Sequence, residues 1–269
     1  MTRFLKRALC NCAGCEADGN KAGATPEGFV PMGSYQPDDL FIIGFPKSGH
    51  TWTQNLIAEA LYGFSAETTP DKLIQDLVPD IHYRKYYKRY HSPMFFKAHA
   101  LPAPEFRRVI YLLRDGRDAI VSYLHHLEAI ERRNMDFLHL VKTGEGLFPC
   151  KWHEHVGRWQ ANPFQASMLV VRYENLIQDT VQQLGRMLSF AGIERSSAQL
   201  EAAVRRSSFS SMQEREKQSG LENSQWPKDR LFVRRGKVGS FQDEMPTEVQ
   251  QAFLLEAAPM MNQLGYIFS

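Results

Sequence analysis

The residues best suited to chemistry lie in one short stretch, Phe41 to Trp52 (FIIGFPKSGHTW). It places Lys47, Ser48 and Gly49 directly before a segment whose apolar residues have helical spacing. Backbone N–H groups at a helix start bind phosphate or sulfate, especially where a glycine permits close approach and a lysine adds charge. The stretch therefore predicts an anion site at the start of a helix.

The elements that must position this site can be read from the same region. The apolar run over residues 40–44 predicts a buried strand, residues 46–49 break it, and a helix is expected from Thr51 onward. Gly44, Gly49 and Thr51 have the spacing of the Walker pattern G-x-x-x-x-G-K-[ST]. However, His50 stands where that pattern needs its lysine, and Lys47 comes earlier. A classical nucleotide hydrolase is therefore disfavoured.

The loop closely resembles the 5′-phosphosulfate loop of the cytosolic-type sulfotransferases, PKSGTTW, from which PKSGHTW differs only at His50. That family moves a sulfuryl group from 3′-phosphoadenosine 5′-phosphosulfate (PAPS) to an acceptor hydroxyl or amine and releases the 3′,5′-bisphosphate PAP. The resemblance implies cofactor contacts from Lys47, Ser48, Gly49, His50, Thr51 and Trp52.

A second segment, RVIYLLRDGRDAIVSYLHH, predicts a buried strand over Val109 to Leu113, then Arg114, then a helix that carries Ser122. The family's 3′-phosphate segment has an Arg and a Ser at this spacing, which implies that role for both residues. An ordinary junction in which Arg114 pairs with a nearby aspartate explains the pattern equally well. Asp115 also fits a Walker B acid, so a P-loop nucleotide kinase stays open as an alternative.

A third segment, residues 231–241 (LFVRRGKVGSF), resembles the family's RKGxxGDW-type loop that closes over the 3′-phosphate. Adjacent arginines supply forked donors for such a group. The matching residues are Arg234, Arg235 and Gly236, and the family's remaining cofactor positions fall on Tyr173, Ser207, Phe209 and Met212. By resemblance, adenine would stack between Trp52 and Phe209, although aromatic residues there would equally suit a core. A kinase needs no 3′-phosphate clamp, so this segment favours the sulfotransferase.

A catalytic base is offered by MFFKAHALP, where a short strand delivers Lys97 and His99 to the same face. Neutral imidazole suits proton abstraction near neutral pH. The resemblance implies that His99 takes the acceptor proton, Lys47 steadies the bridging oxygen and Lys97 stabilises the transferring group. It also implies that Ser122 holds Lys47 back until the acceptor arrives. This scheme needs no metal.

The acceptor pocket is expected to be largely aromatic. CKWHEHVGRW resembles the family's W-x-x-H-V-x-x-W helix, which implies that Trp152 and His155 lie beside the acceptor. On a helix His153 and His155 point to different faces, which disfavours metal chelation by the pair. The expected lining is Phe45, Phe95, Lys97, His99, Tyr123, Trp152 and His155. Such a lining favours a small hydroxyl-bearing acceptor. The basic, aromatic stripe over residues 83–91 predicts a solvated face, or an approach suited to anionic or glycan acceptors.

Bulk properties indicate one α/β domain. The chain has 269 residues, net charge +2 and 23% charged residues, which gives no reason to expect nucleic acid as a partner. We expect a three-layer, P-loop NTPase-like fold with a parallel sheet of about four or five strands. No apolar run approaches the ~20 residues of a membrane span, and the start lacks a secretory segment, which predicts a cytoplasmic protein. The expected division is a flexible tail over 1–36 and a sulfotransferase domain over 37–269.

Three features stay open. Cys10, Cys12 and Cys15 favour free thiols in a flexible tail over zinc binding with Cys150 or acylation. Residues 214–230 are polar and aperiodic, which predicts a mobile lid. The family's K-x-x-x-T-V-x-x-x-E dimer motif is not recognisable over 241–251, so the oligomeric state is left open. A non-catalytic PAPS- or nucleotide-binding module is a further alternative, disfavoured by the intact set of Lys47, Lys97 and His99.

Overall fold

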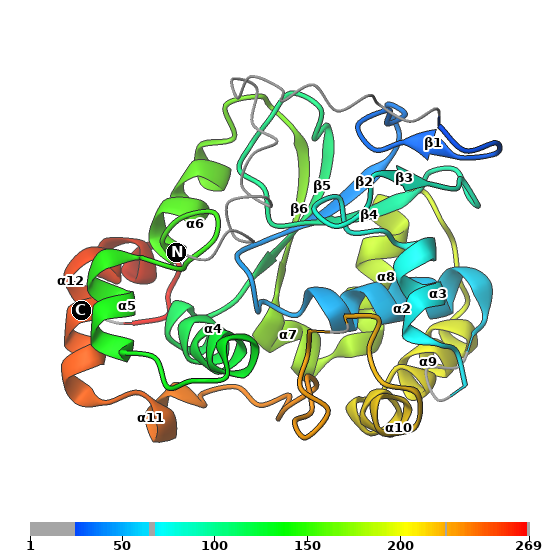
Figure 1. Ribbon diagram of the computed structural model, residues 1–269. Helices are drawn as coiled ribbons and strands as arrows, with labels where there is room; N and C mark the ends of the chain where they lie inside the picture. The colour runs from blue at the N-terminus through cyan, green and yellow to red at the C-terminus, as the bar shows by residue number, and fades with distance from the viewer. Residues whose placement is uncertain (1–24, 65–67, 224, 268–269) are drawn as a thin grey trace.

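The computed structural model describes residues 25–64, 68–223 and 225–267. Its centre is a four-stranded parallel sheet with the strand order β4-β2-β5-β6 (Figure 1). The strands of this sheet are β2 (Leu40–Ile43), β4 (Phe95–Ala98), β5 (Arg108–Leu113) and β6 (Ser167–Arg172). A separate antiparallel pair is formed by β1 (Val30–Pro31) and β3 (Tyr86–Tyr87).

Helices cover both faces of the sheet, which confirms the expected three-layer α/β fold. In Figure 1 the helices α4, α5, α6 and α12 lie on one side of the strands, and α2, α3, α8 and α9 lie on the other. The helices are α2 (His50–Tyr62), α3 (Asp71–Leu77), α4 (Gly116–Glu131), α5 (Phe137–Thr143), α6 (Trp152–Ala161), α7 (Tyr173–Gln178), α8 (Thr180–Phe190), α9 (Ser197–Arg206), α10 (Phe209–Ser219), α11 (Phe241–Glu244) and α12 (Thr247–Gln263).

Strand β2 divides the interior into two cores. All its residues are buried, and they alternate between the faces: Phe41 and Ile43 join the core under α4, α6 and α12, whereas Leu40 and Ile42 join the core under α2, α3 and α8. A strand buried on both faces is continuously apolar, which is why this segment was recognisable in the sequence.

The parallel direction of the strands gathers their carboxyl ends at one edge of the sheet. Strand β2 leads into the 44–49 loop, β4 into His99, β5 into Arg114 and β6 into Tyr173. Ligands of open α/β sheets bind in the crevice outside these ends. The topology therefore brings the sequence-predicted anion residues to one place.

The polar, aperiodic segment over residues 214–230, predicted to be a mobile lid, starts within a helix. Helix α10 continues to Ser219, and its inward side carries Arg215 and Glu216 beside Met212. Nη1 of Arg215 donates to Oδ1 of Asn55 at 2.8 Å. Because the buried positions are charged and paired, the helix shows no apolar period.

The folded part of the chain begins before residue 37. The backbone N–H of Met32 donates to the carbonyl oxygen of Lys85 at 2.9 Å, and the hydroxyl of Tyr87 donates to the backbone carbonyl oxygen of Ser34 at 2.7 Å. Cys10, Cys12 and Cys15 lie outside the described residues. Within the described ranges, no helix is long and apolar enough to cross a membrane.

Candidate active site

The loop after β2 has the backbone of an anion cradle. Lys47 has φ 70° and Gly49 has φ 101°, and α2 begins at once with His50. A Cβ on Gly49 would lie 2.8 Å from the ring of Tyr173, and a Cβ on Gly44 would collide with the carbonyl oxygen of Leu112. Both glycines are therefore required by close approach, and Gly49 also by its positive φ.

Lys47 extends from this loop into a site that disfavours its charge. Its Nζ lies 4.1 Å from the ring centroid of Phe232. Burial, followed by repulsion from Lys97, Arg114 and Arg234, lowers the pKa of Lys47 to about 7. An ammonium in these surroundings gains from an anionic partner, because such a partner would offset both the desolvation and the repulsion.

Arg114 ties the loop to the segment that precedes α11. Its Nη1 donates to the carbonyl oxygen of Lys47 at 2.9 Å and its Nη2 to that of Lys237 at 3.3 Å. The guanidinium lies 4.3 Å from the ring centroid of Tyr173. Its buried Nε has no hydrogen-bond partner among the described residues, which leaves a donor for a ligand.

The K-x-H unit comes from the end of β4, as predicted. Nδ1 of His99 lies 3.1 Å from the carbonyl oxygen of Gly44. A carbonyl only accepts, so Nδ1 carries the proton and Nε2 of the neutral ring is free to act as a base. Burial, followed by the charge of Lys97, lowers the pKa of His99 to about 3, which keeps the imidazole neutral near pH 7.

His50, the residue that departs from the family loop, packs beside His99. The two ring centroids are 4.3 Å apart, with an interplanar angle of 69°. His50 is 3% exposed, and neither ring nitrogen has a hydrogen-bond partner among the described residues. Burial, followed by repulsion from His99 and Lys97, lowers its pKa well below the ordinary value. The ring is therefore neutral and cannot replace the charge of a Walker lysine.

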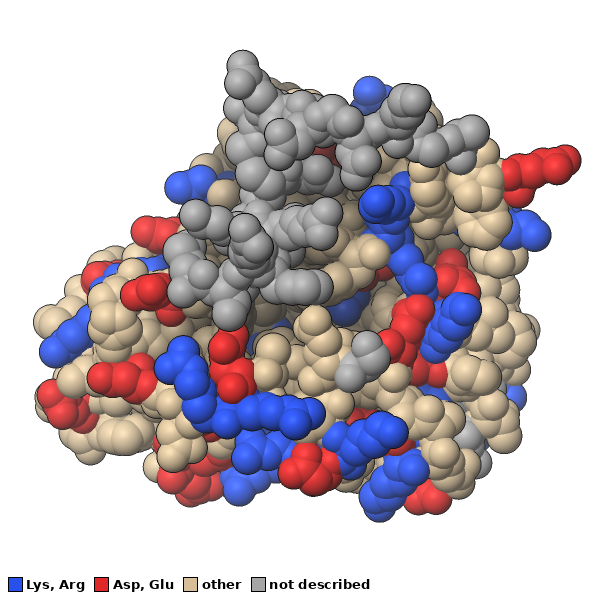
Figure 2. Space-filling view, viewed as in Figure 1, with Lys and Arg blue, Asp and Glu red and all other residues tan. Residues whose placement is uncertain are grey.

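Arg234 and Arg235 lie on the loop that precedes α11, and both pair with one carboxylate. Nη1 of Arg234 is 2.6 Å from Oε2 of Glu244, and Nη1 of Arg235 is 2.9 Å from Oε1. Nε2 of His125 also contacts Oε2 at 2.6 Å. Sequence reasoning missed Glu244, since no motif marks it. Figure 2 shows basic and acidic side chains intermixed on the lower part of this face, where α4, α10 and the following loop lie in Figure 1.

Two further carboxylates hold this loop in place: Glu216, which sequence reasoning missed, and Asp118, a nearby aspartate that also pairs with Nη2 of Arg114 at 3.6 Å. Asp118 accepts from the backbone N–H groups of Gly239 at 2.8 Å and Phe241 at 2.9 Å. Glu216 of α10 accepts from the backbone N–H groups that begin the loop, that of Val233 at 3.1 Å among them. The arginine loop is thus docked on α4 and α10 through its backbone.

The residues expected around adenine are brought together, but two of the rings touch. The centroids of Trp52 and Phe209 are 4.6 Å apart, with an interplanar angle of 41°. Nε1 of Trp52 donates to the carbonyl oxygen of Ser207 at 3.0 Å, and Met212 is buried nearby in the same core. Gly236 packs on the ring of Phe209, which a Cβ would approach to 2.8 Å. A base between the two rings requires them to separate.

Most residues expected in the acceptor pocket share one core. Phe45 lies 5.8 Å from the ring centroid of Tyr123 and 6.1 Å from that of His155. Nδ1 of His155 is 2.9 Å from the hydroxyl of Tyr111, and Trp152 packs in the same cluster. Phe95 does not join them: it is 1% exposed and belongs to the core on the α2 side of the sheet.

Ser122 lies on α4 and is half-buried. Among the described residues, the structure shows no hydrogen bond between Ser122 and Lys47, whose ammonium lies over Phe232. A restraining role of Ser122 on Lys47 therefore stays a prediction.

In the basic stripe over residues 83–91 the two arginines are paired with carboxylates, whereas Lys85 and Lys88 are exposed. Nη2 of Arg89 lies 2.8 Å from Oδ2 of Asp39, and Nη2 of Arg84 lies 2.8 Å from Oε1 of Glu222. Tyr83 is 80% exposed, whereas Tyr87 is buried. These pairings fit a solvated face better than an anion-binding strip.

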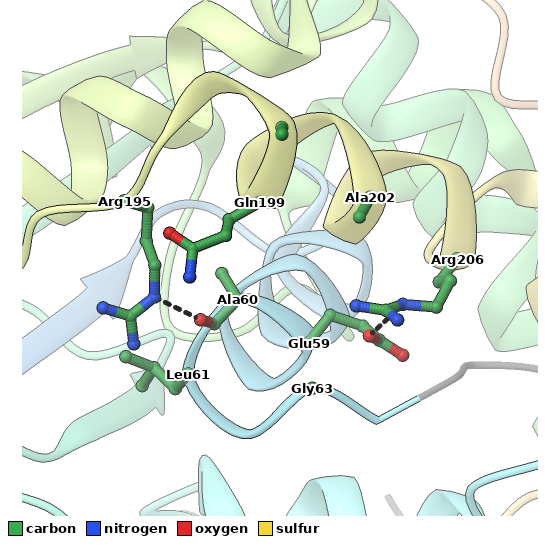
Figure 3. A pocket seen from close by; sticks show the side chains of 9 residues that line it. Glu59, Ala60, Leu61, Gly63, Arg195, Gln199, Ala202 and Arg206 are labelled. Atoms are coloured by element: carbon green, nitrogen blue, oxygen red, sulfur yellow. Dashed lines mark hydrogen bonds and ion pairs between the residues drawn. The ribbon is translucent and has the colours of Figure 1, made fainter.

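A surface cavity of about 390 Å³ lies between α2 and α9, away from these residues (Figure 3). Its polar groups are paired within its wall: Nε of Arg206 is 3.2 Å from Oε2 of Glu59, and Nε of Arg195 donates to the carbonyl oxygen of Ala60 at 2.8 Å (Figure 3). None of the sequence-predicted site residues lines it. Across residues 25–64, 68–223 and 225–267, no group of His, Cys, Asp and Glu is placed to hold a metal ion.

The parallel sheet, the glycine loop and the buried cations at its carboxyl edge define a group-transfer enzyme of the P-loop-like class. The sulfotransferase domain family matches residues 37–263, and the chain belongs to this family. It is 28% identical over 249 residues to cytosolic sulfotransferase 1 of Danio rerio, with 81% of each chain covered. It is 26% identical over 237 residues to the amine sulfotransferase of Oryctolagus cuniculus, with 80% of this chain and 78% of the relative covered.

Solved structures show the same fold. Retinol dehydratase in complex with androsterone and PAP superposes with a TM-score of 0.64 at 20% identity, covering 84% of this chain and 81% of that one. A mouse sulfotransferase complexed with PAP superposes with a TM-score of 0.63 at 21% identity, covering 87% of this chain and 88% of that one. The prediction of a PAPS-dependent sulfotransferase is thus confirmed at the level of the family.

Proposed function

We propose that this enzyme transfers a sulfuryl group from PAPS to a hydroxyl, or an amine, of a small acceptor, with His99 as the general base. The observation that carries this proposal is the contact between Nδ1 of His99 and the carbonyl oxygen of Gly44. It leaves Nε2 unprotonated and fixes the ring against the loop that would hold the phosphosulfate. The base, which follows β4, is thereby held against the donor loop, which follows β2.

The residues at the sheet edge fit a doubly phosphorylated nucleotide. Ser48 Oγ, Ser207 Oγ and Arg114 Nε are buried and have no hydrogen-bond partner among the described residues. Buried polar atoms without partners are rare in native proteins, and a ligand is one explanation. Oxygen acceptors on the two ends of such a nucleotide would give these atoms partners. Lys47 and the start of α2 would hold the 5′-phosphosulfate end, and Arg114, Ser122, Arg234 and Arg235 the 3′-phosphate.

The chemistry assigned to the chain is positioning and charge stabilisation. PAPS supplies the sulfuryl group. Nε2 of His99 accepts the proton of the acceptor hydroxyl as the new oxygen–sulfur bond forms. Lys47 offsets the charge that develops on the departing 5′-phosphate, and Lys97 faces the transferring group. No residue is required to bond covalently to sulfur.

Two alternatives come from other classes. A P-loop nucleotide kinase would need a charged lysine at position 50, where this chain has a buried, neutral histidine. A non-catalytic PAPS-binding module would have no use for a free imidazole base beside the loop. His50 therefore disfavours the kinase, and His99 disfavours the non-catalytic module.

The acceptor is proposed to be small and aromatic or lipophilic, because Phe45, Tyr123 and His155 present rings to one another near His99. The pairing of Arg84 and Arg89 with carboxylates argues against a glycan site on the basic stripe. No metal is invoked.

The test is transfer of labelled sulfate from PAPS to phenols, sterols, aliphatic alcohols, amines and glycans. We expect turnover with one of the small acceptors and PAP binding far tighter than AMP binding, since each charge-assisted bond is worth about 1.5–3 kcal/mol. Turnover confined to glycans would overturn the acceptor class. Equal affinity for PAP and AMP would overturn the 3′-phosphate assignment.

A further inference from the structure

The segment before the basic stripe lies against the outer edge of β4. The backbone N–H of Lys97 donates to the carbonyl oxygen of Pro79 at 2.9 Å, and that of Ile81 donates to the carbonyl oxygen of Lys97 at 3.0 Å. Asp80 and Lys97 therefore form a parallel bridge. Residues paired across neighbouring strands place their side chains on the same face. The sheet is thus extended by one residue where the K-x-H unit leaves it.

Asp80 places a buried carboxylate beside the ammonium of Lys97. The residue is 2% exposed, and its Oδ2 lies 3.2 Å from Nζ of Lys97. The two groups are close but not aligned for a hydrogen bond, because Oδ2 has no hydrogen-bond partner among the described residues. The carboxylate therefore compensates the charge of Lys97 and leaves its N–H donors to turn toward a substrate oxygen.

His82 holds the backbone of the proposed base. Its ring Nε2 accepts from the backbone N–H of His99 at 3.0 Å, and the backbone N–H of His82 donates to Oδ1 of Asp80 at 2.9 Å. The rings of His82 and His99 are parallel within 1°, with centroids 6.3 Å apart. His99 is consequently fixed at both ends, by His82 at its backbone and by the carbonyl oxygen of Gly44 at its ring.

The charges around the site indicate that Asp80 affects the ionisation of its neighbours and not only the stability of the fold. Lys97 lowers the pKa of both His99 and Lys47, whereas Asp80 raises the pKa of His99. Burial opposes the ionisation of Asp80, but the charge of Lys97, with help from the backbone N–H of His82, outweighs it and lowers the pKa of Asp80. A buried ion pair adds little net folding stability, since desolvation offsets its Coulomb gain.

We propose that Asp80 and His82 are positioning residues for sulfuryl transfer, Asp80 acting through the ammonium of Lys97 and His82 through the backbone of His99. This role rests on the proposed function. Neither residue is expected to contact the nucleotide. Their loss should therefore lower turnover and leave nucleotide affinity intact.

The first experiment is a double-variant cycle of Asp80→Asn and Lys97→Gln, with PAPS and 2-naphthol, or the small acceptor that wild type turns over fastest, as probes. We expect Asp80→Asn to lower kcat about 10- to 100-fold with PAP affinity within about twofold of wild type. In the Lys97→Gln background, the same change should cost less than about threefold. Equal losses in both backgrounds, or an unchanged kcat, would overturn the role of Asp80.

A second pair of variants keeps the test decisive if Lys97→Gln leaves Asp80 unpaired and fails to fold. His82→Gln retains an acceptor at the place of Nε2, whereas His82→Leu removes it. We expect His82→Gln to keep most of the wild-type kcat and His82→Leu to lose about tenfold or more, at equal PAP affinity. Equal rates for the two variants would show that His82 is only packing.

Failure of this inference is distinguishable from failure of the proposed function. If wild type transfers sulfate from PAPS and the Asp80 and His82 variants do so at the same rate, only the positioning roles are contradicted. If wild type binds PAP no better than AMP and transfers no sulfate, the proposed function itself is contradicted.

Discussion

The guanidinium of Arg234 lies 2.6 Å from the carboxylate of Glu244. The same carboxylate contacts Arg235 and His125. Burial raises the pKa of Glu244, but the hydrogen bonds from Arg234 and His125 outweigh it, so the pKa falls below its usual range. Two arginines assigned to the cofactor's 3′-phosphate are therefore neutralised by a residue of the protein itself. A phosphate must either replace this carboxylate or share the arginines with it.

Replacing the carboxylate tests which of these holds. We expect Glu244→Gln to tighten PAP binding about three- to thirtyfold by calorimetry, because the arginines lose a competing anion. AMP, which lacks the 3′-phosphate, should bind with unchanged affinity. Asp243→Asn is the matched control, since Asp243 pairs with Lys237 at 3.1 Å and not with the two arginines. Weaker PAP binding by Glu244→Gln would mean that Glu244 orients the arginines.

The pKa of Lys47, lowered to about 7, predicts that nucleotide binding depends on pH. Above pH 7 the ammonium of the free enzyme loses its proton, so binding of an anion must also take up a proton. We expect PAP affinity to fall about three- to tenfold per pH unit between pH 7 and 9, where phosphate monoesters are already dianionic. Lys47→Arg stays charged and should flatten the profile. Parallel profiles for the two proteins would remove Lys47 from the binding site.

The contact between Trp52 and Phe209 predicts how the base binds. If adenine separates and stacks on these rings, Trp52→Ala or Phe209→Ala should cost about 1–3 kcal/mol of PAP binding by calorimetry. A lower melting temperature with intact PAP affinity would instead assign that ring to the core. Phe190→Ala is a suitable control for an aromatic truncation, because Phe190 contacts Arg108, which begins β5, whereas Arg114 follows the other end of that strand.

The residues of the site that belong to sequence motifs were predictable, whereas the residues that pair with them or hold them in place were not. Lys47, Arg114 and His99 follow strands that the apolar runs reveal, and parallel strands bring their ends together. Glu244, Asp80 and His82 lie in polar segments without periodicity, and tertiary packing alone brings them to the site. The misplacement of Phe95 has a simple cause: on β4 it shares a face with Lys97 but lies deeper, under α2. The alternation of side chains along a strand predicts which face of the sheet a residue lies on, but not how far it lies from the carboxyl edge.

Buried neutral histidines predict a loss of stability in mild acid. Burial is the main cause that lowers the pKa of His126 to about 3 and that of His155 to about 4, against 6.5 in an unfolded chain. Between about pH 6.5 and 4 the unfolded state thus binds more protons, so the free energy of unfolding decreases as pH falls through this window. We expect the melting temperature to be lower at pH 5 than at pH 7.5.

A substitution at His126 isolates this effect. Its ring stacks on Trp226 at 5.5 Å, so His126→Phe keeps a ring there and removes the titrating group. This variant should lose less melting temperature between pH 7.5 and 5 than wild type, whereas His139→Gln, at a surface histidine whose side chain is 55% exposed, should match wild type. Identical pH slopes for His126→Phe and wild type would contradict the prediction.

The role of His99 is tested by separating chemistry from binding. His99→Ala should lower kcat for the acceptor about 10²- to 10⁴-fold, because the hydroxyl loses its general base, and should leave PAP affinity nearly unchanged. The buried ring also packs on His50, so thermal unfolding must show that the variant is folded. His139→Ala, at the surface, controls for loss of an unrelated histidine. Wild-type turnover by a folded His99→Ala enzyme would remove His99 from the mechanism and make His50, whose ring nitrogens have no hydrogen-bond partner among the described residues, the next candidate base.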